Sequence, residues 1–224
     1  MAPVLLFSVV AHEYAHAEAA YRQGDPTAHM LGRLTLNPLK HIDPVMTVLF
    51  PAMLWFASGG RFMFAAAKPV PVNPRNYRNF RRGDIIVSLA GIVTNIGLFL
   101  IAALLFAVVG LVGGALHGSA ITLTIVQRML WWTMWLNLLL AFFNLLPIPP
   151  LDGSHVFKYL LSPQAHARYQ QLYRYGYLPL FAFLIFVRMV PAAAAVYLWP
   201  ASTLMNAALS VVGGFALGEG AFPI

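Results

Sequence analysis

The stretch "VVAHEYAHAEAAYRQGDP", Val9 to Pro26, lies mostly within an apolar segment from Pro3 to Tyr21 and places His12, Glu13 and His16 close together within that segment. An ionisable group near the centre of a bilayer costs about 2.5–3.5 kcal/mol on insertion scales, so such groups need a compensating partner. On a helix, His12 and His16 are four residues apart and project from the same face. The segment therefore combines the composition of a membrane helix with a cluster of polar side chains that demands an explanation.

The spacing of these residues favours a metal site. Two imidazoles on one helical face can bind one ion, and Glu13 can reach a water molecule on that ion. This is the H-E-x-x-H pattern of zinc hydrolases, in which the glutamate is the general base. The alternative is a structural cluster, in which a histidine caps the helix end or Glu13 pairs with His16. We favour the metal because this segment is not a surface helix.

The composition indicates a membrane protein. Of the 224 residues, 60% are hydrophobic and 9% are charged, whereas soluble domains carry about 25% charged residues. The mean hydropathy is +0.72. The ranges 85–114 and 129–151 contain no charged residue, and each exceeds the roughly 20 residues that cross the hydrocarbon core. The chain has no cysteine, which excludes disulfides and thiolate metal sites.

Six apolar segments are predicted, without internal repeats, so we expect one domain over residues 1–224. They are Pro3–Tyr21, Val45–Ala57, Ile85–Val112, Ile121–Leu146, Tyr177–Leu198 and Ala201–Leu217. The polar stretch Ser154–Gly176 is predicted to form a short surface helix. The first segment lacks a basic region and a small-residue cleavage site, so we do not expect a cleaved signal peptide. Its short front leaves open whether the chain begins upstream.

The basic residues predict the orientation. The net charge is +7, and twelve of the 14 Lys and Arg residues lie in the connections 22–84 and 154–176. That distribution is typical of cytoplasmic loops and does not point to nucleic acid. All twelve share one side only if Val45–Ala57, which contains Pro51, dips into the membrane without crossing it. We therefore expect the first segment to run from outside to inside. A full second crossing is the alternative.

Asp152 is the candidate third metal ligand. A catalytic zinc site has three protein ligands and leaves one position for water. Asp152 lies in "NLLPIPPLDGSHVF", Asn144 to Phe157, where prolines break the fourth apolar segment at its end. In the proposed topology the first and fourth segments both run towards the cytoplasmic face, so Asp152 can meet His12 and His16. The alternative is a helix cap or a turn residue.

Three motifs together resemble the site-2 protease family of intramembrane zinc metalloproteases. They are "HEYAH", "LAGIVTN" at Leu89–Asn95 and "NLLPIPPLDG" at Asn144–Gly153. The likeness covers about Val4 to Lys158, and the stretches "GDPTA", "GRLTLNPLKHIDP" and "AKPVPVNPRNYRN" are similar to the small prokaryotic branch without a PDZ domain. Ile92 stands where the family usually has proline.

The resemblance implies roles for individual residues. His12, His16 and Asp152 would bind one Zn²⁺ per chain, and Glu13 would be the catalytic base. Asn144 would orient the substrate or stabilise the oxyanion. The resemblance also implies that Asn95 packs near the site, and that the residues from Gly32 to Pro38 form a β-strand to which an extended substrate could add.

The expected fold is an all-α polytopic membrane protein. It has a three-helix catalytic core over about residues 4–158, C-terminal transmembrane helices over about 177–217, and a small β or re-entrant element between the first two core helices. The expected function is hydrolysis of peptide bonds in transmembrane proteins or peptides, in the cell membrane of a prokaryote, with the site towards the cytoplasm. The partners are this substrate and the lipid bilayer, not nucleic acid.

Two other functions are compatible with the sequence, an ion- or proton-coupled transporter and a catalytically inactive membrane binding module. The absence of paired halves argues against the transporter, and the complete set of expected catalytic residues argues against the inactive module. His41 and Asp43 could support a ligand imidazole, but turn residues before Pro44 are the preferred interpretation. The sequence names neither the physiological substrate nor the oligomeric state.

Overall fold

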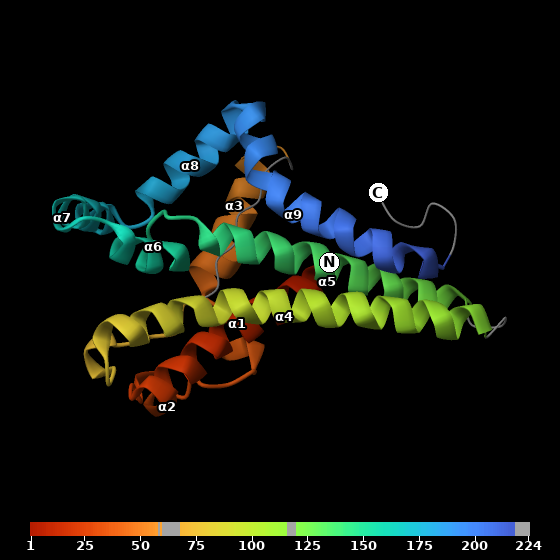
Figure 1. Cartoon of the computed structure of the whole chain (residues 1–224), viewed down its shortest axis with the longest axis horizontal. Helices are drawn as coiled ribbons and strands as arrows, with labels where there is room; N and C mark the ends of the chain where they lie inside the picture. The colour runs from red at the N-terminus through yellow and green to blue at the C-terminus, as the bar shows by residue number, and fades with distance from the viewer. Residues whose placement is uncertain (58, 60–67, 116–119, 218–224) are drawn as a thin grey trace. The chain divides into compact units, whose positions relative to one another are not determined.

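The computed structural model describes residues 1–57, 59, 68–115 and 120–217. The chain divides into two compact units, which are described separately. The smaller unit is Val9–Gly91, and the larger unit combines Met1–Ser8 with Ile92–Ile224. Two helices contribute to both units because each passes through a boundary, α1 (Ala2–Gln23) and α4 (Phe80–Ala115). Helices dominate the described residues, as the sequence predicts (Figure 1).

The larger unit is built on three long helices, the second part of α4, α5 (Ala120–Leu145) and α9 (Pro191–Val212). Their shared core contains buried residues at helical spacing from each. These are Phe99, Ala102 and Phe106 of α4, Trp131, Met134 and Leu138 of α5, and Ala201, Met205 and Val212 of α9. Spacings of i, i+3, i+7 in α4 and α5 and of i, i+4, i+11 in α9 place these residues on one face of each helix. The apolar stripe therefore packs the three helices together.

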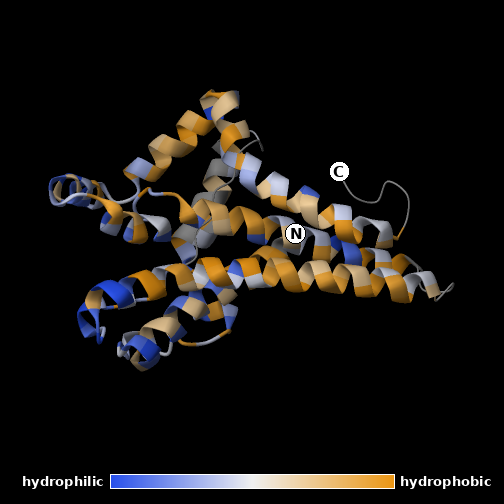
Figure 2. Cartoon of the chain, in the orientation of Figure 1, coloured by the Kyte–Doolittle hydropathy of each residue, from blue (hydrophilic) through white to orange (hydrophobic). Residues whose placement is uncertain are grey.

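The same helices keep large apolar side chains on their outer faces. Leu104 on α4 is 65% exposed and Val196 on α9 is 74% exposed. Figure 2 shows hydrophobic residues along almost the whole of α4 after its first turns. Two described helices, Phe80–Ala115 and Pro191–Phe215, are long and apolar enough to cross a membrane. A helix that is apolar on both its packed and its exposed faces is suited to a lipid environment.

The connection between α5 and α9 contains α6 (Asp152–Phe157), η4 (Lys158–Leu160), α7 (Pro163–Gln171), η5 (Leu172–Tyr175) and α8 (Leu178–Met189). Short helices thus occupy the predicted surface stretch Ser154–Gly176. The predicted boundary between the last two apolar segments is wrong. The break falls at Val190, which has an extended backbone before Pro191, whereas Pro200 lies inside α9. Proline disfavours the α conformation of the residue before it. That residue here is Val190, whose β-branched side chain also favours an extended backbone.

The smaller unit surrounds the second part of α1. It contains α2 (Thr27–Met30), η1 (Pro38–Lys40), η2 (Pro44–Leu49), α3 (Phe50–Ala57), η3 (Pro74–Asn76) and the start of α4. Two small cores form on α1, one from Ala17, Ala28 and Val70 and one from Ala20, Tyr77 and Val87. The small side chains of Ala17 and Ala20 allow the neighbouring segments of the same chain to approach α1 closely.

The β-strand expected from Gly32 to Pro38 is not confirmed, because the described residues include no strand. This stretch bends and leads into η1. Side chains, rather than a neighbouring strand, form the hydrogen bonds with the backbone here. His41 Nε2 donates to the Thr35 carbonyl at 2.8 Å, and Arg33 Nη2 donates to the Lys68 carbonyl at 2.9 Å. Val45–Ala57 is helical in η2 and α3. Whether it dips into the membrane or crosses it stays a prediction.

Candidate metal centre

The two motif histidines lie side by side on α1. Both side chains are buried, and His12 Nε2 lies 2.9 Å from His16 Nε2. His16 Nδ1 donates a hydrogen bond to the Val87 carbonyl on α4 at 2.7 Å. A carbonyl can only accept, so Nδ1 carries the proton and Nε2 of a neutral ring keeps its lone pair. The structure therefore directs a metal-ligating atom of His16 towards His12.

This donor set fits zinc. Zn–N bonds are about 2.0–2.1 Å, so two imidazole nitrogens on one tetrahedral ion lie roughly 3.3 Å apart. The observed separation of 2.9 Å is a few tenths of an ångström shorter. A ligand histidine also characteristically donates its second ring nitrogen to a carbonyl or carboxylate, which fixes the ring and its tautomer. The Val87 carbonyl does this for His16.

Gly91 makes room for His12. A Cβ atom at this α4 position would lie 2.4 Å from His12 Cε1 and 2.6 Å from Nδ1. Any side chain at residue 91 would thus displace the imidazole. The motif "LAGIVTN" contains Gly91, but the sequence analysis assigned significance only to Ile92 and Asn95 of this motif. α4 continues as an unbroken α-helix through Ile92.

Glu13 faces a different neighbour from the histidines. Its Oε2 atom accepts a hydrogen bond from the Val70 backbone N–H at 2.7 Å. The side chain is half-buried. The Glu13 carboxylate thus contacts the chain at Val70, whereas the His16 ring contacts Val87 on α4. Val70 lies in the stretch "AKPVPVNPRNYRN", but sequence reasoning gave it no role, because a contact of its backbone N–H does not depend on the side chain.

Asp152 lies in the larger unit as the first residue of α6, directly after the extended Leu151. Gly153 follows it, where a Cβ atom would lie 2.1 Å from the Leu145 carbonyl oxygen at the end of α5. Only glycine lets α6 begin this close to α5, and this contact places Asp152. The assignment of Asp152 as the third ligand stays a prediction.

Two asparagines named by the sequence have contrasting environments. Asn144 Nδ2 donates to the Leu140 carbonyl of its own helix at 2.9 Å. Asn95 is fully buried, and within the described part of the chain neither of its amide atoms has a hydrogen-bond partner. The structure also supports the turn interpretation of Asp43, because its Oδ1 accepts from the Val45 N–H at 2.9 Å.

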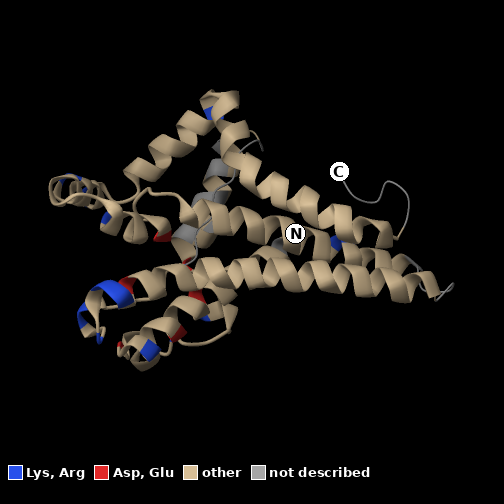
Figure 3. Cartoon of the chain, viewed as in Figure 1, with Lys and Arg blue, Asp and Glu red and all other residues tan. Residues whose placement is uncertain are grey.

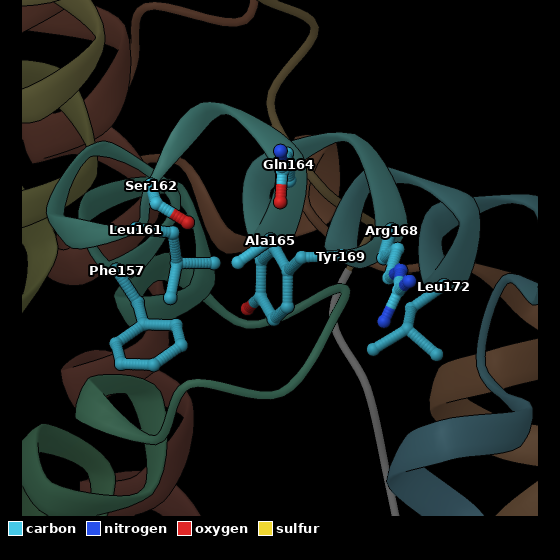
Figure 4. A pocket seen from close by; sticks show the side chains of 8 residues that line it. All are labelled: Phe157, Leu161, Ser162, Gln164, Ala165, Arg168, Tyr169 and Leu172. Atoms are coloured by element: carbon cyan, nitrogen blue, oxygen red, sulfur yellow. The ribbon is translucent and has the colours of Figure 1, made fainter.

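A pocket of about 490 Å³ lies elsewhere, between the end of α6 and the helices that follow it. Figure 4 shows apolar Phe157, Leu161 and Leu172 beside polar Ser162 and Arg168. The lining includes neither the motif residues of α1 nor Asp152. The mixed lining suits a surface segment at a membrane interface.

The arrangement on α1 defines a class of protein before any comparison. Two helix-borne histidines with adjacent ring nitrogens and a neighbouring glutamate are the signature of metal-dependent peptidases. The chain belongs to peptidase family M50, the site-2 protease family, whose model matches residues 1–187. It is therefore a metalloprotease of a membrane-embedded family, and this family implies Zn²⁺ as its cofactor.

Curated relatives have consistent names. The chain is 37% identical to "Putative zinc metalloprotease YwhC" of Bacillus subtilis (strain 168) over 196 residues, which are 88% of this chain and 82% of that protein. It is 34% identical to "Putative zinc metalloprotease Rip2" of Mycobacterium tuberculosis over 163 residues, 71% of this chain and 56% of that protein. The chain thus matches little more than half the length of this relative. No solved structure matches the chain.

Proposed function

We propose that this chain is an intramembrane zinc metalloprotease that hydrolyses peptide bonds of transmembrane proteins or peptides within or near the bilayer. One observation carries the proposal. The Nε2 atoms of His12 and His16 lie 2.9 Å apart on a buried face of α1, and Glu13 is the adjacent residue. A soluble peptidase would not need long helices with exposed apolar faces, which α4 and α9 have.

Asp152 is proposed as the third zinc ligand. The chain has no cysteine, so the remaining ligand must come from His, Asp or Glu. Asp152 is the carboxylate at the start of α6, where the prolines after Asn144 end the preceding helix. Two histidines and one carboxylate are a common catalytic zinc set and leave the fourth position for water.

The chain's own residues would then carry the proton transfers. Zn²⁺ held by His12, His16 and Asp152 would supply acidification of a water molecule and polarisation of the scissile carbonyl. Glu13 accepts the proton of the attacking water and delivers it to the leaving amine. Asn144 is proposed to orient the substrate or to donate to the oxyanion. Its NH₂ group has two N–H donors, so one can stay on the Leu140 carbonyl while the other serves this role.

The membrane setting completes the proposal. Arg81 and Arg82 lie at the start of α4, and the rest of that helix has no basic residue (Figure 3). Basic residues mark cytoplasmic ends of membrane helices, so we propose that the site opens towards the cytoplasm. The substrate helix must unwind locally, because helical hydrogen bonds shield its peptide bonds.

The test is cleavage of a single-pass membrane substrate by the purified chain in proteoliposomes. Glu13→Gln should retain one zinc per chain and lose cleavage by at least about 10²-fold, because only the base is removed. His16→Ala should lose zinc and activity together. Glu18→Gln, the same chemical change at an exposed ion pair on α1, is the matched control and should cleave normally.

A fully active Glu13→Gln variant would refute the role given to Glu13. Zinc-loaded wild-type protein that transports an ion across the vesicle membrane but cleaves nothing would favour the transporter. Wild-type protein that neither cleaves nor transports, with substrate bound, would favour the inactive module.

A further inference from the structure

The segment Lys68–Tyr77 follows one face of α1 within the smaller unit. Val70 packs against Ala17 and Ala28, and Tyr77 packs against Ala20. On α1, Glu13, Ala17 and Ala20 follow an i, i+4, i+7 spacing and so share one stripe. The 68–77 segment therefore covers the stripe that carries Glu13, and its Val70 N–H donates to the Glu13 carboxylate at 2.7 Å.

This contact bears directly on the proposed base. A carboxylate has two oxygens, and each can accept hydrogen bonds. The Val70 N–H occupies Oε2 and fixes the orientation of the carboxylate, which leaves Oε1 for a water molecule. General-base catalysis requires this oxygen within about 2.6–3.2 Å of the proton that it removes. The position of the 68–77 segment thus determines where Glu13 points.

A second buried carboxylate, Asp25, anchors the segment at its other end. Asp25 is fully buried and accepts four hydrogen bonds. Two come from the backbone N–H and the hydroxyl of Thr27. The other two come from the 68–77 segment, the Asn73 N–H at 2.6 Å and Asn76 Nδ2 at 2.8 Å. Burial alone would raise the pKa of Asp25, but these hydrogen bonds outweigh it and lower the pKa below its ordinary value.

Further contacts fix the beginning of the segment. Arg33 Nη2 donates to the carbonyl of Lys68 at 2.9 Å and more weakly to that of Pro69 at 3.4 Å. The Lys68 N–H donates to the His41 carbonyl at 2.9 Å. Residues 68–73 have no regular secondary structure, so no ladder or helix sets their position. The anchors on either side of Val70 must do so.

We propose that Asp25 is a positioning residue for the reaction, because it fixes the 68–77 segment so that the Val70 amide orients Glu13. This inference rests on the proposed function, in which Glu13 is the base. The simpler alternative is that Asp25 only closes the turn between α1 and α2. Its two bonds with Thr27 serve that turn, but its bonds with Asn73 and Asn76 do not.

The experiment compares Asp25→Asn with Glu18→Gln in the full chain, again an acid-to-amide change for each residue. An amide offers one acceptor oxygen and turns an NH₂ group towards donors that now bind a carboxylate. Asp25→Asn should lower kcat by about tenfold or more, because misplaced catalytic groups lose rate steeply. KM should change less than about twofold, and zinc content should stay at one per chain. Glu18→Gln should leave kcat within about twofold of wild type.

A double-variant cycle tests whether Asp25 acts through Glu13. Glu13→Asp shortens the base by one methylene, so its carboxylate no longer reaches the Val70 amide in the same position. In that background Asp25→Asn should change kcat by less than about twofold, since the contact is already lost. Equal fold-losses in both backgrounds would overturn the inference and leave Asp25 as a turn residue.

Asn76→Ala decides the matter if Asp25→Asn does not fold. It removes one of the four hydrogen bonds to Asp25 and should lower kcat about threefold at unchanged zinc content. Unchanged kcat in this variant would overturn the inference. Failure of the proposed function itself would look different, because wild type and Glu13→Gln would then behave alike.

Discussion

At the scale of single residues, neighbours in the motif have different partners. A helix turns about 100° per residue, so Glu13 lies about 100° around α1 from His12 and about 60° from His16. The histidines face α4, through the Val87 carbonyl and Gly91. Glu13 faces the 68–77 segment. The proposed ligands and the proposed base therefore contact separate parts of the smaller unit, so one can be changed without the other.

Gly91→Ala tests the placement of the ligands. The new Cβ atom would lie 2.4–2.6 Å from the His12 ring, so we expect zinc affinity to fall by about tenfold or more, as happens when groups around a ligand are disturbed. Cleavage at limiting zinc should fall with it. The control is Gly97→Ala on the same helix, where a Cβ atom meets nothing within 4 Å. Equal zinc content of the two variants would contradict the packing seen at Gly91.

At the scale of elements, the larger unit combines apolar packing with buried polar contacts, among them those of Gln127. Gln127 of α5 is fully buried. Its Nε2 donates to the carbonyls of Phe106 and Phe215, and its Oε1 accepts from the Leu217 N–H. Gly110 on α4 admits Phe215, because a Cβ atom there would lie 1.9 Å from the Phe215 carbonyl oxygen. Gln127 thus fastens the chain after α9 to both α4 and α5.

Gln127→Leu should destabilise the protein markedly. It leaves the Leu217 N–H and the Phe215 carbonyl without this partner, and each buried unsatisfied group costs about 1–3 kcal/mol. The midpoint of thermal unfolding in detergent should fall by roughly 4–8 °C. Thr133→Val on the same helix is the control, since its hydroxyl bonds only the Met129 carbonyl of α5 and is exposed. Equal melting temperatures for both variants would show that the Gln127 contacts contribute little.

At the scale of the whole molecule, the exposed surface of the long helices is as informative as their core. Leu104 and Val196 lie outside the core on helices long enough to cross a membrane. The lipid bilayer removes the cost of exposing such side chains to water. Membership of family M50 agrees with a membrane protein. The number of crossings and their orientation belong to the proposal.

Single cysteines can test the topology, because the chain has none of its own. Arg22 and Arg75 are exposed and lie before and after the Val45–Ala57 segment. If that segment only dips into the membrane, Arg22→Cys and Arg75→Cys should both react with an impermeant thiol reagent from the cytoplasmic side. Ile121→Cys, which is exposed at the start of α5, should react from the opposite side. Labelling of Arg22→Cys and Arg75→Cys from opposite faces would mean that the segment crosses.

Several features could be predicted from the sequence because they depend on local pattern. Apolar runs of about 20 residues predict long helices, and α1, α4 and α5 confirm the runs from residues 3, 85 and 121. An i, i+4 spacing places His12 and His16 together on any helix, and the structure confirms it. The boundary near Pro191 was missed, since either Pro191 or Pro200 could break an apolar run and only packing selects between them.

What the sequence by itself determined was the pairing of His12 and His16, since residue type and helical spacing suffice to bring two imidazoles together. Only the tertiary structure decided what surrounds them. The Val87 carbonyl, the space at Gly91 and the Val70 amide that contacts Glu13 come from residues 57 to 79 positions away along the chain. Those contacts leave no pattern in the local sequence. A backbone amide, a carbonyl group or a glycine takes part in the site only when folding places it beside its partner.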